Sequence, residues 1–250
     1  MGEQVDSLEG IFRQGDLYDD VYRGRGKDYL AEADVVLDLI REHNPSARSL
    51  LDVGCGTGSH LSRFREAFDH VEGIDLAEDM VRVARAKLPD VGLHVGDMRD
   101  FDLGRRFDAI ACLFSVIAYL PGEADIEVAI ERLARHLEPG GVVVVEPWYF
   151  PETAVDRHVV SDVARVDGRT IARVSRGERV GDSHHIEAHY VVAHPEEGIR
   201  HFADVHVLAV VARERYEKAF AAAGISARHV QSPRPGLYGP GLFVGVRQEQ

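Results

Sequence analysis

The stretch SLLDVGCGTG (residues 49–58) decides the fold of this 250-residue chain. Its first half is a short apolar run typical of a buried strand, and its second half has a glycine at every second position. Glycines at a strand-to-helix turn let the backbone approach a ligand closely, beside the positive end of the helix. Ser59 stands where the dinucleotide-binding pattern G-x-G-x-x-G requires its third glycine. The stretch therefore predicts an α/β fold that binds a nucleoside-like ligand where its first strand ends.

Strand and helix patterns alternate around this stretch. Further strands are expected over 70–75, 93–96, 107–114, 141–146, 225–231 and 241–247, and helices over 28–43, 58–68, 123–136 and 213–223, with one more helix that ends at Lys87. The break after helix 123–136 is expected at Pro139, Gly140 and Gly141. Short apolar strands between amphipathic helices indicate a largely parallel sheet with helices on both faces. The sequence thus predicts a Rossmann-like core of seven strands.

Residues 157–210 do not follow this pattern. Alternating polar and apolar residues are interrupted by turn residues at 167–168, 181–182 and 196–198. Such spacing is typical of an antiparallel meander of three or four strands. We expect a core formed by 1–148 and 211–250, with an antiparallel insertion at 149–210 between the fifth strand and the last helix. This insertion is predicted to cap the substrate and to offer a dimer surface.

Composition excludes several classes of protein. The chain carries 29 basic and 42 acidic residues, and the resulting net charge of −13 argues against nucleic acid as a partner. No apolar run approaches the ~20 residues of a membrane span, and the N-terminus lacks the layout of a secretory signal. The two cysteines, Cys55 and Cys112, cannot build a disulfide framework and suit a reducing compartment. A soluble cytoplasmic protein is expected.

Acidic residues follow the second and third predicted strands. Asp75 closes the second strand, where a carboxylate can accept both hydroxyls of a ribose. Asp97 and Met98 follow the third strand, where they could hold the amino group and the ring face of an adenine. Taken singly, these residues could be a helix cap, a turn former and core filling. Together with the glycine turn, they resemble the nucleoside site of class I S-adenosylmethionine (SAM) methyltransferases.

A narrower resemblance covers nearly the whole chain. Its segments are YDDVYRGRGKDY (18–29), SLLDVGCGTGSHL (49–61), GDMRDFDLGRRF (96–107), GGVVVVEPWYFPE (140–152), DGRTIARVS (167–175) and GLFVGV (241–246). They resemble the N,N-dimethyltransferases of dTDP-3-amino-deoxysugars, which complete desosamine- and mycaminose-type sugars in macrolide pathways. The resemblance implies a class I methyltransferase fold, SAM as methyl donor, two successive methylations of a sugar amine, and a homodimer.

The family's site residues can be carried over by position. The expected SAM contacts are Tyr22, Gly54, Gly56, Asp75, Leu76, Asp97, Met98 and Leu113. The expected substrate contacts are Tyr18, Tyr22, Glu146, Trp148, Arg173 and Ser175. Pro240 and His185 stand where the family pattern has arginines, which leaves the nucleotide and the sugar open, and Arg234 could supply a replacement charge.

Methyl transfer to an amine requires a neutral nitrogen held in line with the methyl group and shielded from water. Tyr18, Tyr119 and Glu146 are the candidate catalytic residues, because the last two follow strands that end at the same crevice. Our hypothesis is that Tyr18 orients the amine and that no single residue is an indispensable base. The rings of Tyr18, Tyr22 and Trp148 could stabilise a sulfonium by cation–π contact or simply pack the N-terminal segment.

Two further clusters allow more than one interpretation. His185, Glu187 and His189 alternate along one predicted strand and could bind a metal, but a polar strand face is favoured because amine methylation needs no Lewis acid. Residues 157–179 hold six arginines and three acidic residues, a local charge of +3. This stretch could face a nucleotide diphosphate across the crevice, or it could be a solvated hairpin face.

Three rival functions remain at this stage. A sugar O-methyltransferase would share the fold, but a hydroxyl nucleophile calls for a strong base or a metal, and no obvious acidic ligand pair follows the strands. A dinucleotide-dependent oxidoreductase is disfavoured by Ser59 and by the Asp97–Met98 pair. A non-catalytic SAM-binding protein is disfavoured by the region around Glu146 and Trp148.

Overall fold

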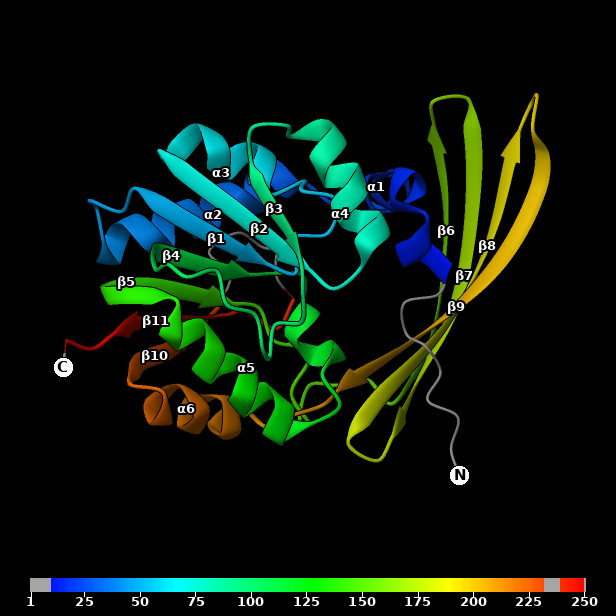
Figure 1. Cartoon of the computed structure of the whole chain (residues 1–250). Coiled ribbons are helices and arrows are strands. Elements are labelled where there is room, and N and C mark those ends of the chain that lie inside the picture. The colour runs from blue at the N-terminus through cyan, green and yellow to red at the C-terminus, as the bar shows by residue number, and fades with distance from the viewer. Residues whose placement is uncertain (1–9, 232–238, 250) are drawn as a thin grey trace.

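Two separate β-sheets organise the molecule. A computed structural model describes residues 10–231 and 239–249, apart from the side chain of Asp16. A seven-stranded sheet surrounded by helices forms the core, and a four-stranded antiparallel sheet stands beside it (Figure 1). In the described part of the chain no helix is both long and apolar enough to cross a membrane.

The core sheet has the strand order β10-β11-β5-β4-β1-β2-β3. Its strands are β1 (Ser49–Val53), β2 (His70–Asp75), β3 (Gly92–Val95), β4 (Phe107–Cys112), β5 (Leu137–Val145), β10 (Ile225–Val230) and β11 (Leu242–Arg247). Neighbouring strands from β5 to β3 are parallel, whereas β11 runs antiparallel to both β5 and β10. The carboxyl ends of β1, β2, β3, β4 and β5 therefore meet at one edge, where ligands bind in open α/β sheets.

Helices cover both faces of this sheet. They are α2 (Tyr29–His43), α3 (Leu61–Ala67), α4 (Glu78–Lys87), α5 (Glu123–Arg135) and α6 (Arg213–Ala222). Apolar side chains of α2, α3 and α4 pack on one face, and those of α5 and α6 pack on the other. The predicted seven-stranded α/β core is confirmed. Some boundaries differ. The helix predicted over 58–68 begins at Leu61, the strand predicted over 107–114 ends at Cys112, and Pro139, Gly140 and Gly141 lie inside β5 and not in a break before it.

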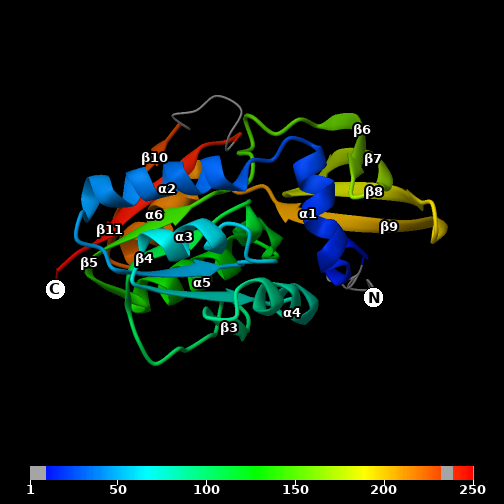
Figure 2. The same cartoon turned by 90° about the horizontal axis from the view of Figure 1, so that it is seen from above.

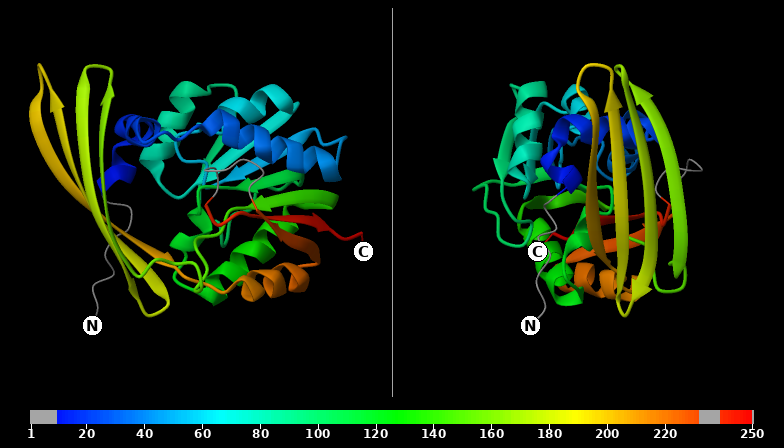
Figure 3. Two further views of the ribbon diagram at one scale, coloured as in Figure 1. Left: turned by 180° about the vertical axis from the view of Figure 1, so that it is seen from behind. Right: turned by 90° about the vertical axis from the view of Figure 1, so that its right-hand side faces the viewer.

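The insertion is a meander of four long strands. These are β6 (Arg157–Val166), β7 (Arg169–Val180), β8 (Ser183–His194) and β9 (Gly198–Ala209). Each strand is antiparallel to the next, and the turns fall at the predicted positions. Figure 3 shows the outer face of this sheet, which none of the described helices covers.

A short helix, α1 (Gly15–Gly24), lies between the two sheets and contacts α4 and β6 (Figure 2). Its residue Asp19 is buried and accepts hydrogen bonds from the hydroxyls of Thr57 (2.7 Å) and Ser59 (3.1 Å) in the glycine turn. Lys87 of α4 forms an ion pair with the same carboxylate. These contacts fix α1 over the carboxyl edge of the core sheet.

Candidate active site

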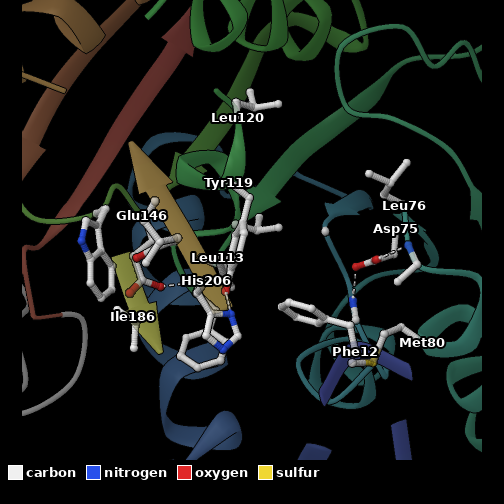
Figure 4. A pocket seen from close by; sticks show the side chains of 18 of the residues that line it. Phe12, Asp75, Leu76, Met80, Leu113, Tyr119, Leu120, Glu146, Ile186 and His206 are labelled. Atoms are coloured by element: carbon white, nitrogen blue, oxygen red, sulfur yellow. Dashed lines mark hydrogen bonds between the residues drawn. The ribbon is translucent and has the colours of Figure 1, made fainter. Parts of the chain in front are cut away.

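A cavity of about 590 Å³ lies between the carboxyl edge of the core sheet, α1 and the inner face of the insertion. Figure 4 shows part of its wall. The cavity is lined by every site residue expected from the sequence: Tyr18, Tyr22, Gly54, Gly56, Asp75, Leu76, Asp97, Met98, Leu113, Tyr119, Glu146, Trp148, Arg173 and Ser175. The fold thus brings together residues from both sheets and from α1 around one space.

The glycine turn and Asp75 form one end of this cavity. Gly54 and Gly56 have φ values of 75° and 53°, which favour glycine, and a Cβ on Gly54 would lie 2.5 Å from a methyl group of Val116. The backbone N–H groups of Gly56 and Ala77 donate to the two oxygens of Asp75, each at 2.8 Å. Burial raises the pKa of Asp75 and these backbone hydrogen bonds oppose that shift. The carboxylate is held at the cavity with acceptor capacity left on both oxygens.

Asp97 and Met98 follow β3 along the same wall. The guanidinium of Arg99 donates hydrogen bonds to both oxygens of Asp97 and holds the pKa of this carboxyl below its usual value. Arg99 also pairs with Asp125 at 2.7 Å, which anchors the turn to α5. Leu76, half exposed, offers apolar surface on the neighbouring strand end. A nucleoside would find both an acceptor and apolar faces here.

Aromatic rings close the cavity above the glycine turn. Tyr18 and Tyr22 lie one turn apart on α1 with their ring centroids 4.7 Å apart, and Tyr22 meets Phe114 edge-on at 4.9 Å. Lys27 places its ammonium 3.7 Å from the centre of the Phe114 ring. Burial raises the pKa of both tyrosines, so their hydroxyls are neutral near pH 7.

Glu146 occupies the end of β5 beside a strained corner. Its carboxylate accepts a hydrogen bond from the backbone N–H of Phe114 at 2.5 Å, and burial raises its pKa to about 7. Phe114 and Ser115 both have positive φ values, of 56° and 54°. Non-glycine residues adopt this conformation uncommonly, and such positions cluster at functional sites. The Ser115 hydroxyl donates to the carbonyl oxygen of Pro147 at 2.8 Å, which ties the ends of β4 and β5 together.

Tyr119 belongs to a short 3₁₀ helix, η2 (Val116–Tyr119), and contacts a histidine that sequence reasoning missed. Its hydroxyl lies 2.8 Å from Nδ1 of His206 on β9. Phe12, also missed, packs its ring against both side chains. Phe12 belongs to a second 3₁₀ helix, η1 (Gly10–Arg13). These contacts join the insertion and the N-terminal segment to the core. No pattern within one segment of the sequence therefore predicts them.

The insertion contributes Arg173 and Ser175 to the cavity. Arg173 is buried, donates to the Ser175 hydroxyl at 2.8 Å and lies 3.7 Å from Asp162. It is the only one of the six arginines of residues 157–179 that lines the cavity, so the possibility of a cationic cap is wrong for the other five. Strand alternation places Arg157, Arg165 and Arg176 on the outer face. Arg169 pairs with Asp20, and Arg179 donates to the Pro151 carbonyl oxygen.

The predicted histidine row lies on the outer face of β8. His189 contacts Glu187 and His201, each at 3.0 Å, and both His189 and Glu187 are exposed. Within residues 10–231 and 239–249, no three side chains of ligand type are grouped as a metal would require. Of the two departures from the family pattern, Pro240 lines the cavity and His185 does not, whereas Arg234 lies outside the described residues.

Comparisons with known proteins agree with this geometry. A family model for a methyltransferase domain matches residues 50–141. The chain is 52% identical over 231 residues (92% of its length and 96% of the relative's) to dTDP-3-amino-3,4,6-trideoxy-alpha-D-glucopyranose N,N-dimethyltransferase of Streptomyces venezuelae. It is 42% identical over 233 residues (93% and 92%) to dTDP-4-amino-2,3,4,6-tetradeoxy-D-glucose N,N-dimethyltransferase of Saccharopolyspora spinosa. The chain belongs to this family of dTDP-aminosugar N,N-dimethyltransferases.

A solved structure extends the comparison to the methyl donor. SAM-bound CalS10, an amino pentose methyltransferase from Micromonospora echinaspora involved in calicheamicin biosynthesis, is 48% identical with a TM-score of 0.86, and the match covers 93% of this chain and 97% of that chain. As a dTDP-aminosugar N,N-dimethyltransferase, the chain is a SAM-dependent enzyme with a class I fold. The predictions of the fold, the enzyme class and the methyl donor are therefore confirmed.

The residues present fit SAM. A Cβ built on Gly56 meets no atom within 4 Å, so the space beside this turn is open to a ligand. Asp75 and Asp97 supply acceptors, and Leu76, Met98 and Leu113 supply apolar surface on the same wall. This donor set suits a ribose and an adenine, and the neutral aromatic rings of α1 suit a sulfonium.

Proposed function

We propose that this enzyme transfers two methyl groups in succession from SAM to the amino group of a dTDP-linked deoxyaminosugar in antibiotic sugar biosynthesis. One observation carries the proposal: the nucleoside-type wall around Asp75 and the wall formed by Tyr18, Tyr119 and Glu146 belong to a single cavity. The names of the relatives support the amine as the acceptor and dTDP as the carrier.

The chain's own residues would hold the methyl donor as follows. Asp75 accepts hydrogen bonds from the ribose hydroxyls, Asp97 accepts one from the adenine amino group, and Met98 packs on the ring. The remaining contacts come from Tyr22, Gly54, Gly56, Leu76 and Leu113. When bound, SAM supplies an electrophilic methyl group: the amine nitrogen forms a bond to this carbon, the carbon–sulfur bond breaks, and its electron pair stays on sulfur.

The other half of the cavity orients the substrate. Tyr18 positions the amine by hydrogen bonding, because its raised pKa makes it a poor base at neutral pH. Glu146, with a pKa of about 7, exists in both protonation states near neutrality and can exchange a proton there. Tyr22, Trp148, Arg173 and Ser175 contact the sugar nucleotide. No single residue among Tyr18, Tyr119 and Glu146 is indispensable as a base.

The insertion also supports the proposal of a homodimer. Aliphatic side chains on its outer face are more than one third exposed: Val159, Val163, Val174, Val180, Val191, Ile199 and Val207. An exposed apolar face with charged neighbours is typical of a surface that a second copy covers. A cytoplasmic location is supported by the two buried free thiols of Cys55 and Cys112.

A substrate panel tests the proposed reaction. The enzyme is mixed with labelled SAM and with matched dTDP-aminosugars and dTDP-hydroxysugars, and the products are weighed by mass spectrometry. The expected result is a gain of one and then two methyl groups on an aminosugar only. Methylation of a hydroxysugar would establish an O-methyltransferase instead. SAM binding without methyl transfer to any substrate would indicate a non-catalytic SAM-binding protein. Aminosugars that differ in the position of the amine identify the acceptor.

A further inference from the structure

A chain of three polar side chains leads from the cavity wall into the insertion. The Tyr119 hydroxyl lies 2.8 Å from Nδ1 of His206, and Nε2 of His206 lies 3.5 Å from a carboxylate oxygen of Asp204. The backbone N–H of Ile11 donates to that same oxygen at 3.0 Å. His206 is 4% and Asp204 is 6% exposed, whereas Tyr119 is only partly buried and faces the cavity.

The position of Asp204 sets the direction of this chain. Its oxygen, which already accepts the Ile11 N–H, favours a proton on the facing Nε2 of His206. Nδ1 of His206 then has a free lone pair and accepts the Tyr119 hydroxyl. The lone pairs of the Tyr119 oxygen are left to accept a hydrogen bond from a donor in the cavity, such as an amine N–H.

Apolar side chains of the described residues also pack against His206. Phe12 packs edge-on against the His206 ring at 5.7 Å, and Ile186 is its partner on β8 (Figure 4). Among the described residues, the charged and titratable groups that face it are Asp204 on its own strand, Arg173 on β7 and Tyr119 on η2. Burial and the Arg173 guanidinium lower the pKa of His206 and Asp204 opposes this shift, so the imidazole is neutral at pH 7.

We propose that His206, acting through Tyr119, takes up the proton that the sugar amine must lose between the first and the second methyl transfer. The proposal rests on the proposed function. After one transfer the nitrogen is a secondary ammonium without a lone pair. Its proton moves to the Tyr119 oxygen while the Tyr119 hydroxyl proton moves to Nδ1 of His206. The amine regains its lone pair, Tyr119 stays neutral, and the positive charge rests on the imidazolium beside Asp204.

The proton returns to solvent by the reverse route after the product has left. Burial disfavours the ammonium in the cavity for the same reason that it disfavours an imidazolium. Asp204 beside Nε2 offsets part of this cost for the imidazolium, whereas the Arg173 guanidinium adds to it. His206 is thus a positioning residue that acts through Tyr119, which itself contacts the substrate. Water can replace the relay more slowly, so the second transfer slows without it but does not stop.

The variant His206→Gln tests this relay, because glutamine can bond to Tyr119 but cannot take up a proton. The matched control is His136→Gln, which alters an equally buried histidine (4% exposed) between α5 and β5, outside the cavity. The ratio of dimethylated to monomethylated sugar is measured across a pH series, together with SAM affinity. Below neutral pH we expect His206→Gln to slow the second transfer about tenfold more than the first. Its product ratio returns to that of the wild type at alkaline pH.

Tyr119→Phe is the second variant and should show the same pH-dependent stall, with no further loss in the double variant. A product ratio equal to the wild type at every pH would overturn the relay. So would equal slowing of both transfers without pH dependence, which indicates a structural role. If no aminosugar is methylated by the wild-type enzyme, the proposed function fails and not the relay alone.

Discussion

Glu146 shows how a single buried side chain serves both the fold and the site. It satisfies the backbone N–H of Phe114, the first of two residues with positive φ at the end of β4. This corner carries the chain from Leu113 to Tyr119, and both line the cavity. Because the carboxyl group is buried, it titrates near neutral pH, where the carboxyl of a surface glutamate is already charged.

Glu146→Gln should make stability less dependent on pH. An unfolded glutamate titrates near 4.3, and the folded pKa of Glu146 is about 7. Between these values the folded state binds more protons, so the wild type loses up to about 4 kcal/mol of unfolding free energy as pH rises through this window. Glutamine can keep the bond to Phe114 without this loss. Urea denaturation at several pH values measures the unfolding free energy of both proteins. A gap between the two proteins that stays constant from acidic to alkaline pH would show that Glu146 does not titrate this way.

Asp75→Asn should weaken SAM binding by about 10- to 100-fold, as expected for hydrogen bonds to a charged group. Both carboxylate oxygens accept backbone N–H groups, so an amide also loses one of these two bonds. Calorimetry with SAM measures the effect. The control is Asp69→Asn, an exposed position immediately before the same strand. Unchanged affinity in the Asp75 variant would remove this residue from the predicted SAM site.

At the scale of elements, α1 shows where prediction from sequence reaches its limit. The ten-residue helix has no side-chain cap at Gln14, and a helix this short is marginal on its own. Its stability comes from tertiary contacts such as Asp19 with Thr57, which no local pattern encodes. The core strands, by contrast, were predictable because hydrophobic runs and breaks occur within each segment. The residues predicted for the site line one cavity, because strand ends and family motifs mark them, and their individual roles stay predictions.

The turns of the insertion determine which residues share a face of its sheet, and this pairing extends the site beyond the residues predicted from the sequence. The tight turn at 181–182 and the turn around residue 196 fix antiparallel pairing symmetrically about them, so Ser175 pairs with Ala188 and Ala188 with Asp204. Arg173 and Ser175 were expected to face the substrate, and this pairing places Asp204 and His206 on the same face. The residues considered as a possible site were instead His185, Glu187 and His189, which face outward. The turns do not predict the contact between His206 and Tyr119, because that contact depends on how the two sheets pack.

Gly24→Ala should displace α1 from the insertion. A Cβ on Gly24 would lie 2.1 Å from the Cβ of Ala164 on β6, and neither group can rotate away. Since α1 carries Tyr18 and Tyr22, we expect KM for SAM and for the sugar to rise about tenfold, as displaced contacts cost of order 1–2 kcal/mol. The control is Gly122→Ala, where a Cβ meets no atom within 4 Å. Steady-state kinetics with wild-type KM values in both variants would contradict this role of α1.

At the scale of the whole molecule, the two faces of the insertion's sheet differ in their role. Its inner face supplies Arg173, Ser175 and His206 to the cavity, whereas its outer face exposes a set of aliphatic side chains. Strand alternation separates these roles residue by residue. A second copy on the outer face would stiffen the sheet from behind, and therefore the cavity wall, without entering the site.

Val174→Glu tests this outer face. Val174 lies on the outer face of β7, which has a neighbouring strand on each side, and its side chain is 52% exposed. A glutamate there would bury a charge in the proposed interface, so we expect the dimer to dissociate into monomers, seen by light scattering over a concentration series. SAM affinity should persist, because the neighbouring Arg173 and Ser175 side chains point the other way. The control Val128→Glu alters an exposed valine of α5 and should leave the dimer intact. A dimer that survives Val174→Glu, or a wild type that is monomeric throughout, would assign the outer face another task.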